Sequence, residues 1–161
     1  MDLEGLLKSL NARDVRYVII GATAFPVHGY VRATLDVDIL IEPTEGNARR
    51  TWEALREFGY DVTDVSIGDL LTKKILVRQY MLETDIHPSA AGVTFEQVWA
   101  NRVEGAIGET PTCFAGLDDL IAMKQAAGRP KDLEDLRMLL KLRKRSSTRI
   151  AEHQHRRTRN T

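Results

Sequence analysis

The segment Leu35–Ile41 constrains the fold of this chain most, because it begins with strict alternation of apolar and acidic side chains. Side chains of a β-strand point alternately to opposite faces, so Asp36 and Asp38 share one face of the strand. The other face carries the apolar residues Leu35, Val37 and Ile39. Two like charges on one strand face repel, and strand interiors disfavour aspartate. The segment therefore predicts a sheet with one face in the core and a positively charged group near its acidic face.

Hydrophobic periodicity along the rest of the chain predicts alternating strands and helices. The expected strands are Tyr17–Ile20, Leu35–Ile41, Ile75–Gln79, Leu82–His87 and a hairpin over Val103–Phe114 that turns at Gly108-Glu109. The expected helices are Leu3–Asn11, Ala22–Gly29, Thr44–Gly59, Leu117–Ala127 and a last helix from Pro130 with Leu133, Leu136, Leu139 and Leu140 toward the core. Strands on either side of residues 80–81 are expected to be antiparallel neighbours. The fold class is α/β (α+β): a mixed β-sheet flanked by helices, with C-terminal helices.

Length and composition are those of one folded domain, with 161 residues, 43% of them hydrophobic and 29% charged. The longest apolar stretch, Val15–Val27, is interrupted by Arg16 and is shorter than the roughly 18 to 20 residues of a membrane span. The first residues lack the basic and apolar segments of a signal peptide. A single cysteine, Cys113, excludes an intramolecular disulfide. We expect a cytoplasmic protein without a membrane segment.

The neutral net charge hides an uneven distribution along the chain. From Lys141 to Thr161 there are eight basic residues and one acid, a net charge of +7, so residues 1–140 carry −7. We expect a folded domain over residues 1–143 and a basic, disordered tail over residues 144–161. The tail is interpreted either as a solvated, frayed helix end or as an electrostatic arm for nucleic acid. Its lack of aromatic residues for base stacking favours the solvated end.

The acidic strand face is a candidate metal site. Mg²⁺ prefers carboxylate oxygens and completes its coordination with waters and substrate phosphates, so Asp36 and Asp38 are candidate ligands for in-line displacement at phosphorus. A third carboxylate is expected from the strand Leu82–His87, where Asp85 is the first candidate and Glu83, on the same face, the alternative. A solvated strand edge is the competing interpretation of the two aspartates taken alone.

A candidate anion site precedes the acidic strand. Gly21–Ala24 follows a buried strand and opens a predicted helix, so its backbone N–H groups and the helix dipole favour a triphosphate. Arg32 either steers phosphate or pairs with an aspartate of the acidic face.

Other polar residues have structural as well as functional interpretations. His28 is expected to make a capping or core hydrogen bond, whereas His87 either contacts a nucleobase or phosphate or has a structural role. An ion-pair network that fixes the last two helices is expected from Arg129, Asp132 and Asp135.

Two motifs, in order, carry a resemblance to a known family. The pattern Gly21-Ala22-x-Ala24-x-x-x-His28-Gly29-x-x-Arg32-x-Thr34-x-Asp36-x-Asp38 resembles the signature of minimal nucleotidyltransferases of the DNA polymerase β superfamily. It is more closely similar to small AbiEii-type nucleotidyltransferases of bacterial toxin–antitoxin and phage-defence systems. The pattern Lys124-x-x-Ala127-Gly128-Arg129-x-Lys131-Asp132-x-x-Asp135 is similar to the lysine–arginine–Asp-x-x-Asp motif on the last two helices of those proteins.

The resemblance implies a nucleotidyltransferase fold and a Mg²⁺-dependent enzyme. Such an enzyme transfers a nucleoside monophosphate from an NTP, for example ATP, to a hydroxyl of RNA such as tRNA, of protein or of a small molecule. The implied catalytic metal ligands are Asp36, Asp38 and Asp85, with Asp85 also a candidate base toward the acceptor. The implied nucleotide-binding residues are Gly21, Ala22, Thr23, Arg32 and Lys124. Where the family usually has Gly-Ser or Gly-Gly, this chain has Gly21-Ala22; either Thr23 supplies the missing hydroxyl or the site binds nucleotide weakly.

Three functions remain open from the sequence. The first is an active nucleotidyltransferase in a toxin–antitoxin or defence pair, with a cognate toxin or antitoxin as partner. The second is an antitoxin that adenylylates its partner toxin. The third is a catalytically degenerate fold that binds a partner or RNA. The intact carboxylates argue against degeneracy, and Ala22 argues for it.

Overall fold

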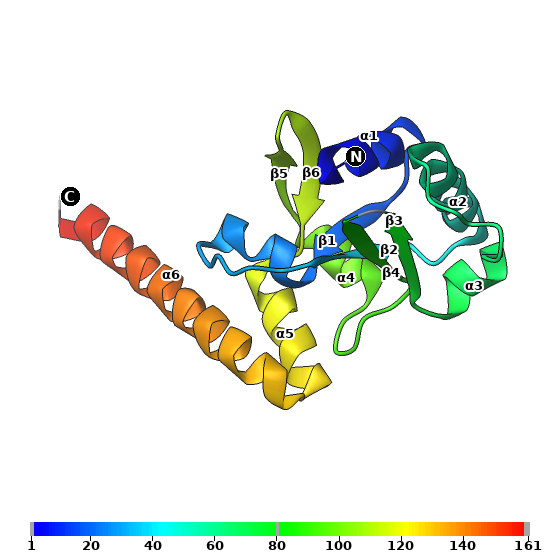
Figure 1. The fold of residues 1–161 in the computed structure, drawn as a ribbon. Helices are drawn as coiled ribbons and strands as arrows, with labels where there is room; N and C mark the ends of the chain where they lie inside the picture. The colour runs from blue at the N-terminus through cyan, green and yellow to red at the C-terminus, as the bar shows by residue number, and fades with distance from the viewer. Residues whose placement is uncertain (1, 80, 160–161) are drawn as a thin grey trace.

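A mixed sheet of six strands forms the centre of the protein, in the order β3-β4-β2-β1-β6-β5, with helices packed around it (Figure 1). The computed structural model describes residues 2–79 and 81–159. The strands are β1 (Tyr17–Ile20), β2 (Asp36–Ile41), β3 (Ile75–Gln79), β4 (Leu82–His87), β5 (Val103–Ile107) and β6 (Thr110–Phe114). The helices are α1 (Leu3–Ala12), α2 (Glu45–Phe58), α3 (Ile67–Thr72), α4 (Phe95–Ala100), α5 (Leu117–Ala127) and α6 (Leu133–Arg159). The expected α/β (α+β) fold with C-terminal helices is confirmed.

The strand pairing decides which side chains meet. The strand β2 is antiparallel to β1 and parallel to β4, and β4 is antiparallel to the edge strand β3. At the other edge β5 and β6 form the hairpin that the sequence predicts, with β6 parallel to β1. The acidic strand β2 thus lies inside the sheet, between β1 and β4.

The core lies on the face of β2 and β4 that the alternation predicts to be apolar. Val37 and Ile39 of β2 and Ile86 of β4 are buried, while Asp36, Asp38, Asp85 and His87 on the opposite face are only partly exposed. On the core face Tyr60 hydrogen-bonds the buried Thr84 at 2.9 Å. The helices supply the rest of the core, with α1 packed on α2 and α5 on α6. On the opposite face the polar groups are confined to one part of β2 and β4, because Val18, Ile20 and Leu40 on that face are buried.

Capping residues explain why the long helix α2 has nearly the predicted bounds. The side chain of Thr44 accepts a hydrogen bond from the backbone N–H of Asn47, and Gly59 ends the helix with a left-handed φ of +111°. The helices α3 and α4 were not predicted, because six residues are too few to show a helical period. Their N-caps, Ser66 and Thr94, are the sequence signals that could have located them.

Three local predictions are wrong. The expected helix Ala22–Gly29 is two 3₁₀ turns, η1 (Gly21–Ala24) and η2 (Pro26–His28), because Pro26 has no N–H to continue a helix. Leu35 is 88% exposed, since β2 begins one residue later. Leu133 is 62% exposed because a 3₁₀ turn, η3 (Pro130–Asp132), precedes α6 and leaves its first residue outside the packed face.

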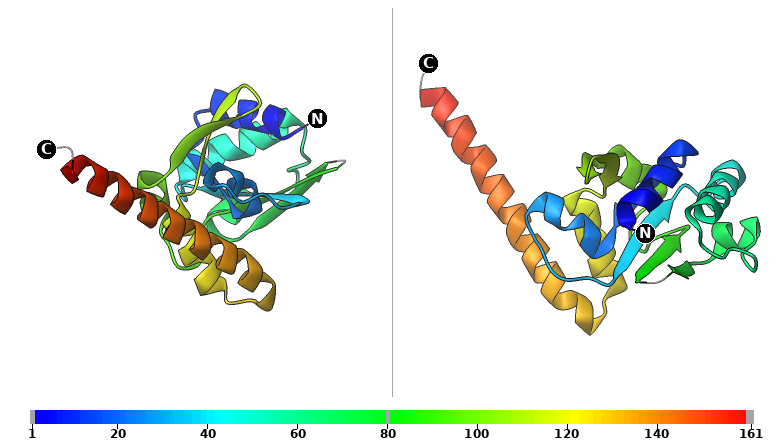
Figure 2. Two further views of the ribbon diagram at one scale, coloured as in Figure 1. Left: turned by 90° about the vertical axis from the view of Figure 1, so that its left-hand side faces the viewer. Right: turned by 45° about the horizontal axis from the view of Figure 1, so that its top comes forward.

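The helix α6 continues to Arg159, where the sequence predicts an end near Leu142 and a disordered tail; residues 160–161 lie outside the described part. Its second half has no glycine or proline and contains many good helix formers. Figures 1 and 2 show this half projecting away from the sheet. The division of the chain into a folded domain over residues 1–143 and a tail over residues 144–161 stays a prediction. Within the described residues, no helix combines the length and apolarity of a membrane span.

Candidate active site

The turn after β1 brings the backbone against the acidic face of β2. Gly21 has a φ of +67°, and a Cβ at this position would lie 2.6 Å from Oδ2 of Asp38. Glycine avoids both the backbone strain that a positive φ causes in other residues and the steric clash of a Cβ with Asp38. The backbone of the Gly21–Ala22 turn therefore directly adjoins the Asp38 carboxylate.

Parallel pairing of β2 with β4 places the predicted third carboxylate beside the first pair. Asp38 is directly opposite Asp85, and Asp36 is opposite Glu83. Glu83 forms an ion pair with Arg78 on the edge strand, whereas the nearest cation to Asp85 is Lys74, whose Nζ lies 3.9 Å from Oδ2. We call Asp36, Asp38 and Asp85 the strand cluster. Of the two candidates on β4, Asp85 is the one that faces Asp38.

His87 joins the strand cluster from the next position on the same face of β4. Its Nε2 lies 2.8 Å from Oδ1 of Asp38. Ligand atoms of Asp38, Asp85 and His87 all lie within 4.8 Å of one another. From the sequence, His87 is open between a contact to a nucleobase or phosphate and a structural role, and it is not among the implied catalytic or nucleotide-binding residues. The period-two alternation of Leu82–His87 is the signal that puts it on the face of Asp85.

The donor set fits a divalent cation. Carboxylate oxygens of Asp38 and Asp85 converge, and Asp36 forms no ion pair with any described residue. The imidazole of His87 hydrogen-bonds Oδ1 of Asp38 and thereby orients this carboxylate. The other oxygen, Oδ2, is then left for a cation.

Burial and like charges act together on Asp85. Burial is the main cause that raises its pKa, and the neighbouring charges of Asp38 and Asp36 raise the pKa further, against Lys74 and His87. This carboxylate therefore holds a proton more readily than a free aspartate.

A second charged group, which we call the helix cluster, joins the segment from α5 through η3 to the start of α6 with the loop before β2. It consists of Arg32, Lys124, Arg129, Asp132 and Asp135. Lys124 Nζ lies 2.9 Å from Asp132 and 3.2 Å from Asp135. Arg129 donates to Asp132 at 2.7 Å, and Arg32 donates to both oxygens of Asp135 at 2.7 and 2.8 Å. The expected network exists, and Arg32 pairs with Asp135 instead of an aspartate of the acidic strand.

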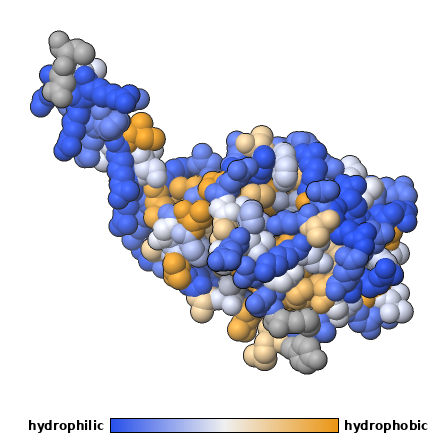
Figure 3. All heavy atoms as spheres, turned by 90° about the horizontal axis from the view of Figure 1, so that it is seen from above, coloured by the Kyte–Doolittle hydropathy of each residue, from blue (hydrophilic) through white to orange (hydrophobic). Residues whose placement is uncertain are grey.

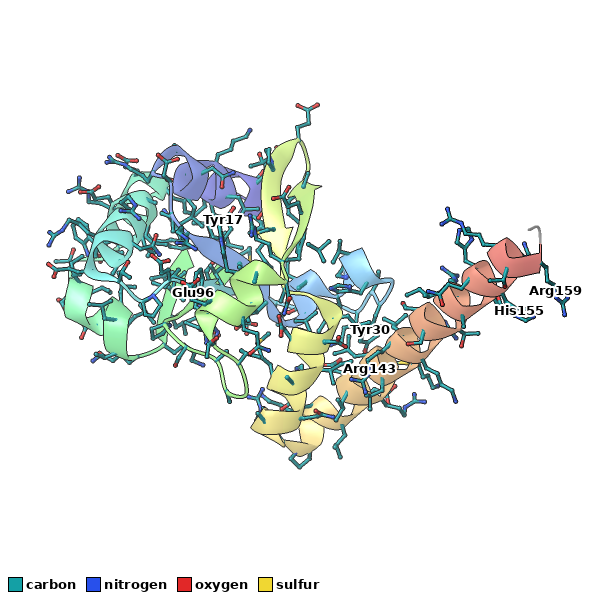
Figure 4. The ribbon with its side chains drawn as sticks, turned by 180° about the vertical axis from the view of Figure 1, so that it is seen from behind. Tyr17, Tyr30, Glu96, Arg143, His155 and Arg159 are labelled. Carbon is teal, nitrogen blue, oxygen red and sulfur yellow. The ribbon has the colours of Figure 1, made fainter. Side chains whose placement is uncertain are left out.

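Aromatic contacts and hydrogen bonds fix the helix cluster further. Tyr30, which lies against α6, donates to Asp135 at 3.0 Å (Figure 4). Burial alone would raise the pKa of Asp132, but hydrogen bonds from Arg129 and Lys124 lower it to about 2. His28 makes the expected core hydrogen bond, with Nε2 2.8 Å from the carbonyl oxygen of Ala115. These contacts fix α5 and the start of α6 against the segment between β1 and β2.

A cleft of about 790 Å³ separates the two clusters. Every predicted site residue except Thr23 lines it: Gly21, Ala22, Arg32, Asp36, Asp38, Asp85 and Lys124. His87, Lys74, Arg129 and Lys131 also line it. A smaller cavity of about 260 Å³ adjoins Asp38 and His87 and is walled by Leu120 and Met123 of α5. The cleft thus has an acidic wall, a basic wall and room for a nucleotide-sized ligand.

Residues 2–147 match the family model described as nucleotidyltransferase of unknown function (DUF6036). The chain belongs to this nucleotidyltransferase family. Among solved structures, it is similar to ANT(2″)-Ia in complex with adenylyl-2″-tobramycin, at 16% identity and a TM-score of 0.53. That alignment covers 91% of this chain and 95% of the other, and at this identity it shows a shared fold. None of the curated proteins matches.

Proposed function

We propose that this protein transfers a nucleoside monophosphate from a Mg²⁺-bound NTP to a hydroxyl of an RNA or protein acceptor. The observation that carries the proposal is the strand cluster, in which Asp38 and Asp85 face each other across parallel strands beside Asp36. Membership of a nucleotidyltransferase family supports it. Carboxylates crowded on one wall of a cleft, facing cations on the other, suit a ligand that combines divalent cations with phosphates.

In this proposal Asp36, Asp38 and Asp85 hold the cations. Bound Mg²⁺ would supply polarisation of the phosphoryl group and neutralise charge that develops during displacement. His87 keeps Asp38 in one orientation through its hydrogen bond. Asp85 is also the candidate base toward the acceptor hydroxyl, because it lies directly opposite Asp38 on the cleft wall.

The triphosphate is assigned to the space beside the Gly21–Ala22 turn, because both residues line the cleft and have little or no side chain to fill it. Lys124 has two of its three ammonium donors on Asp132 and Asp135, so one donor remains for a phosphate. Arg129, whose side chain is 55% exposed, and Lys131 offer further positive charge in the cleft. Thr23 lies outside the cleft lining, so we assign it no phosphate contact.

ATP is the first nucleotide to test, because the structurally similar ANT(2″)-Ia holds an adenylylated small molecule. The resemblance of the sequence to AbiEii-type nucleotidyltransferases supports a place in a toxin–antitoxin or phage-defence pair, with a cognate toxin or antitoxin as partner.

A degenerate fold that binds a partner or RNA is the second candidate. The observation that favours it is the absence of a hydroxyl at Ala22 together with the position of Thr23 outside the cleft lining. In this case the protein would retain the three carboxylates of the strand cluster but would not catalyse nucleotidyl transfer.

The test uses α-labelled NTPs, Mg²⁺, total RNA and cell lysate, with the wild type, Asp38→Asn, Asp85→Asn and Glu83→Gln. We expect label in one acceptor class and a loss of at least ~10²-fold in the two cluster variants, the scale of one preorganised electrostatic group. Glu83→Gln is the matched control, because Glu83 lies on the same face but pairs with Arg78. Full transfer by Asp85→Asn with loss in Glu83→Gln would contradict the assignment. Absence of label with the wild type would favour the degenerate fold.

A further inference from the structure

The second half of α6, residues 143–159, forms an arm that nothing in the described chain covers. Every residue of this arm is exposed. Figure 3 shows it standing out from the body of the protein with a mostly hydrophilic surface. The first half of α6, in contrast, carries Asp135 into the cleft wall and buries Leu139. A continuous helix therefore connects the cleft to an exposed charged surface.

The charge of the arm is almost unneutralised. It contains seven basic residues and one acid, Glu152. Arg143 lies 3.8 Å from Asp118, and no other basic side chain of the arm forms an ion pair with a described residue. Like charges four residues apart, such as Arg145 and Arg149, destabilise an isolated helix. A polyanion would remove this repulsion.

The basic side chains are concentrated on one side of the arm. Arg145, Arg149, Arg156 and Arg159 recur at spacings of three, four and seven residues that place them on one helix face, with Glu152 among them, while Arg143, Lys144 and Arg157 lie outside it. From Arg145 to Arg159 the stripe is about 21 Å long at 1.5 Å per residue. Phosphates follow one another every 3.4 Å along the axis of one nucleic-acid strand, so a stripe of this length spans several of them. Figure 4 shows Arg143, His155 and Arg159 along this helix.

We propose that the arm binds RNA through its phosphates. The arm has no aromatic residue, so the contact is electrostatic and independent of base sequence. The choice of RNA rests on the proposed function, because each RNA nucleotide offers the hydroxyl that the transfer requires. Asp135 and Arg156 are 21 residues apart on one helix, or about 31 Å, so a bound RNA of moderate length reaches the cleft.

The test measures binding of a labelled RNA hairpin, and of a DNA hairpin of the same sequence, by fluorescence anisotropy from 50 to 300 mM salt. The arm variant is Arg145→Gln, Arg149→Gln and Arg156→Gln. The control is Lys8→Gln, Arg49→Gln and Lys73→Gln, which removes the same charge from exposed sites on α1, α2 and the end of α3. We expect the arm variant to lose at least 10-fold in RNA affinity at about 100 mM salt and to lower the salt slope by about 2 to 3. The control should stay within about 3-fold of the wild type, allowing for long-range charge effects.

Binding that is equal in the two triple variants would overturn the proposal, as would binding of the DNA hairpin alone. Loss of a dimer in the arm variant, with no RNA binding by the wild type, would instead identify the acidic body of a second copy as the partner. Asp38→Asn should bind RNA like the wild type, so a failure of transfer and a failure of RNA binding are separate results.

Discussion

The two walls of the cleft use the same charged side chains in opposite ways. In the strand cluster, Asp38 and Asp85 face each other, and the nearest ammonium lies 3.9 Å away from Asp85 on an exposed lysine. In the helix cluster, Asp132 and Asp135 each contact two cations between 2.7 and 3.2 Å. The first arrangement has three carboxylates and one distant lysine, whereas the second has three cations around two carboxylates. An aspartate is thus a candidate ligand when carboxylates outnumber the cations around it, and a structural residue when two close cations hold it.

The pKa shifts follow the same division. Burial and neighbouring carboxylates raise the pKa of Asp85, whereas donors from Arg129 and Lys124 overcome burial and lower the pKa of Asp132 to about 2. The residue type alone does not distinguish the two roles. The charges that face each carboxylate do, because an opposite charge favours the ionised form and a like charge opposes it.

Breaking the helix cluster should produce the largest change in stability. In Asp135→Asn the half-buried cations Arg32 and Lys124 lose a charged partner whose side chain is 5% exposed. We expect a loss of about 3 kcal/mol in the free energy of unfolding, measured by urea titration. The control is Glu134→Gln, one residue away, which breaks an exposed pair with Arg137 and should cost less than about 1 kcal/mol. Equal losses in the two variants would contradict a structural role for the helix cluster.

A smaller effect is expected in the acid dependence of stability. The pKa of Asp132 is about 2 in the folded protein, below its ordinary value of 3.8. Its ionised form therefore contributes stability that is complete above about pH 5 and is lost as the pH falls toward 2, on the order of 1 to 2 kcal/mol. Urea titrations between pH 7 and 3 should show the wild type losing more stability than Asp132→Asn. Parallel curves for the two proteins would contradict the assignment.

How far the sequence predicts this molecule depends on whether the signal is local. Alternation in Leu35–Ile41 and Leu82–His87 predicts both strands and their polar faces, and Thr44 and Gly59 mark the ends of α2. Local patterns miss what needs partners distant in the chain. The pairing of Arg32 with Asp135, 103 residues apart, depends on how α6 docks. His87 acquires its role only because parallel pairing brings it to Asp38.

For the second half of α6 the prediction is wrong for a different reason. The sequence beyond Leu142 lacks an apolar stripe, so periodicity predicts no packed helix, yet intrinsic propensity is enough to extend one that packing has already started. The carboxylate assignment at Asp85 was open between two residues on one face. The structure distinguishes Glu83 from Asp85, because Glu83 forms an ion pair with Arg78 on the neighbouring strand.

The contrast between the clusters is tested most directly by thermal unfolding of the wild type and the double variant Asp38→Asn, Asp85→Asn. Each is measured with and without Mg²⁺ and a non-hydrolysable ATP analogue. Without ligand, the variant should be at least as stable as the wild type, because the substitution removes like-charge repulsion. With ligand at about 100 times its Kd, the wild type should gain about 2.7 kcal/mol and the variant much less. The same gain in both proteins, or a variant that is less stable without ligand, would contradict the claim that these carboxylates are arranged to bind cations with nucleotide.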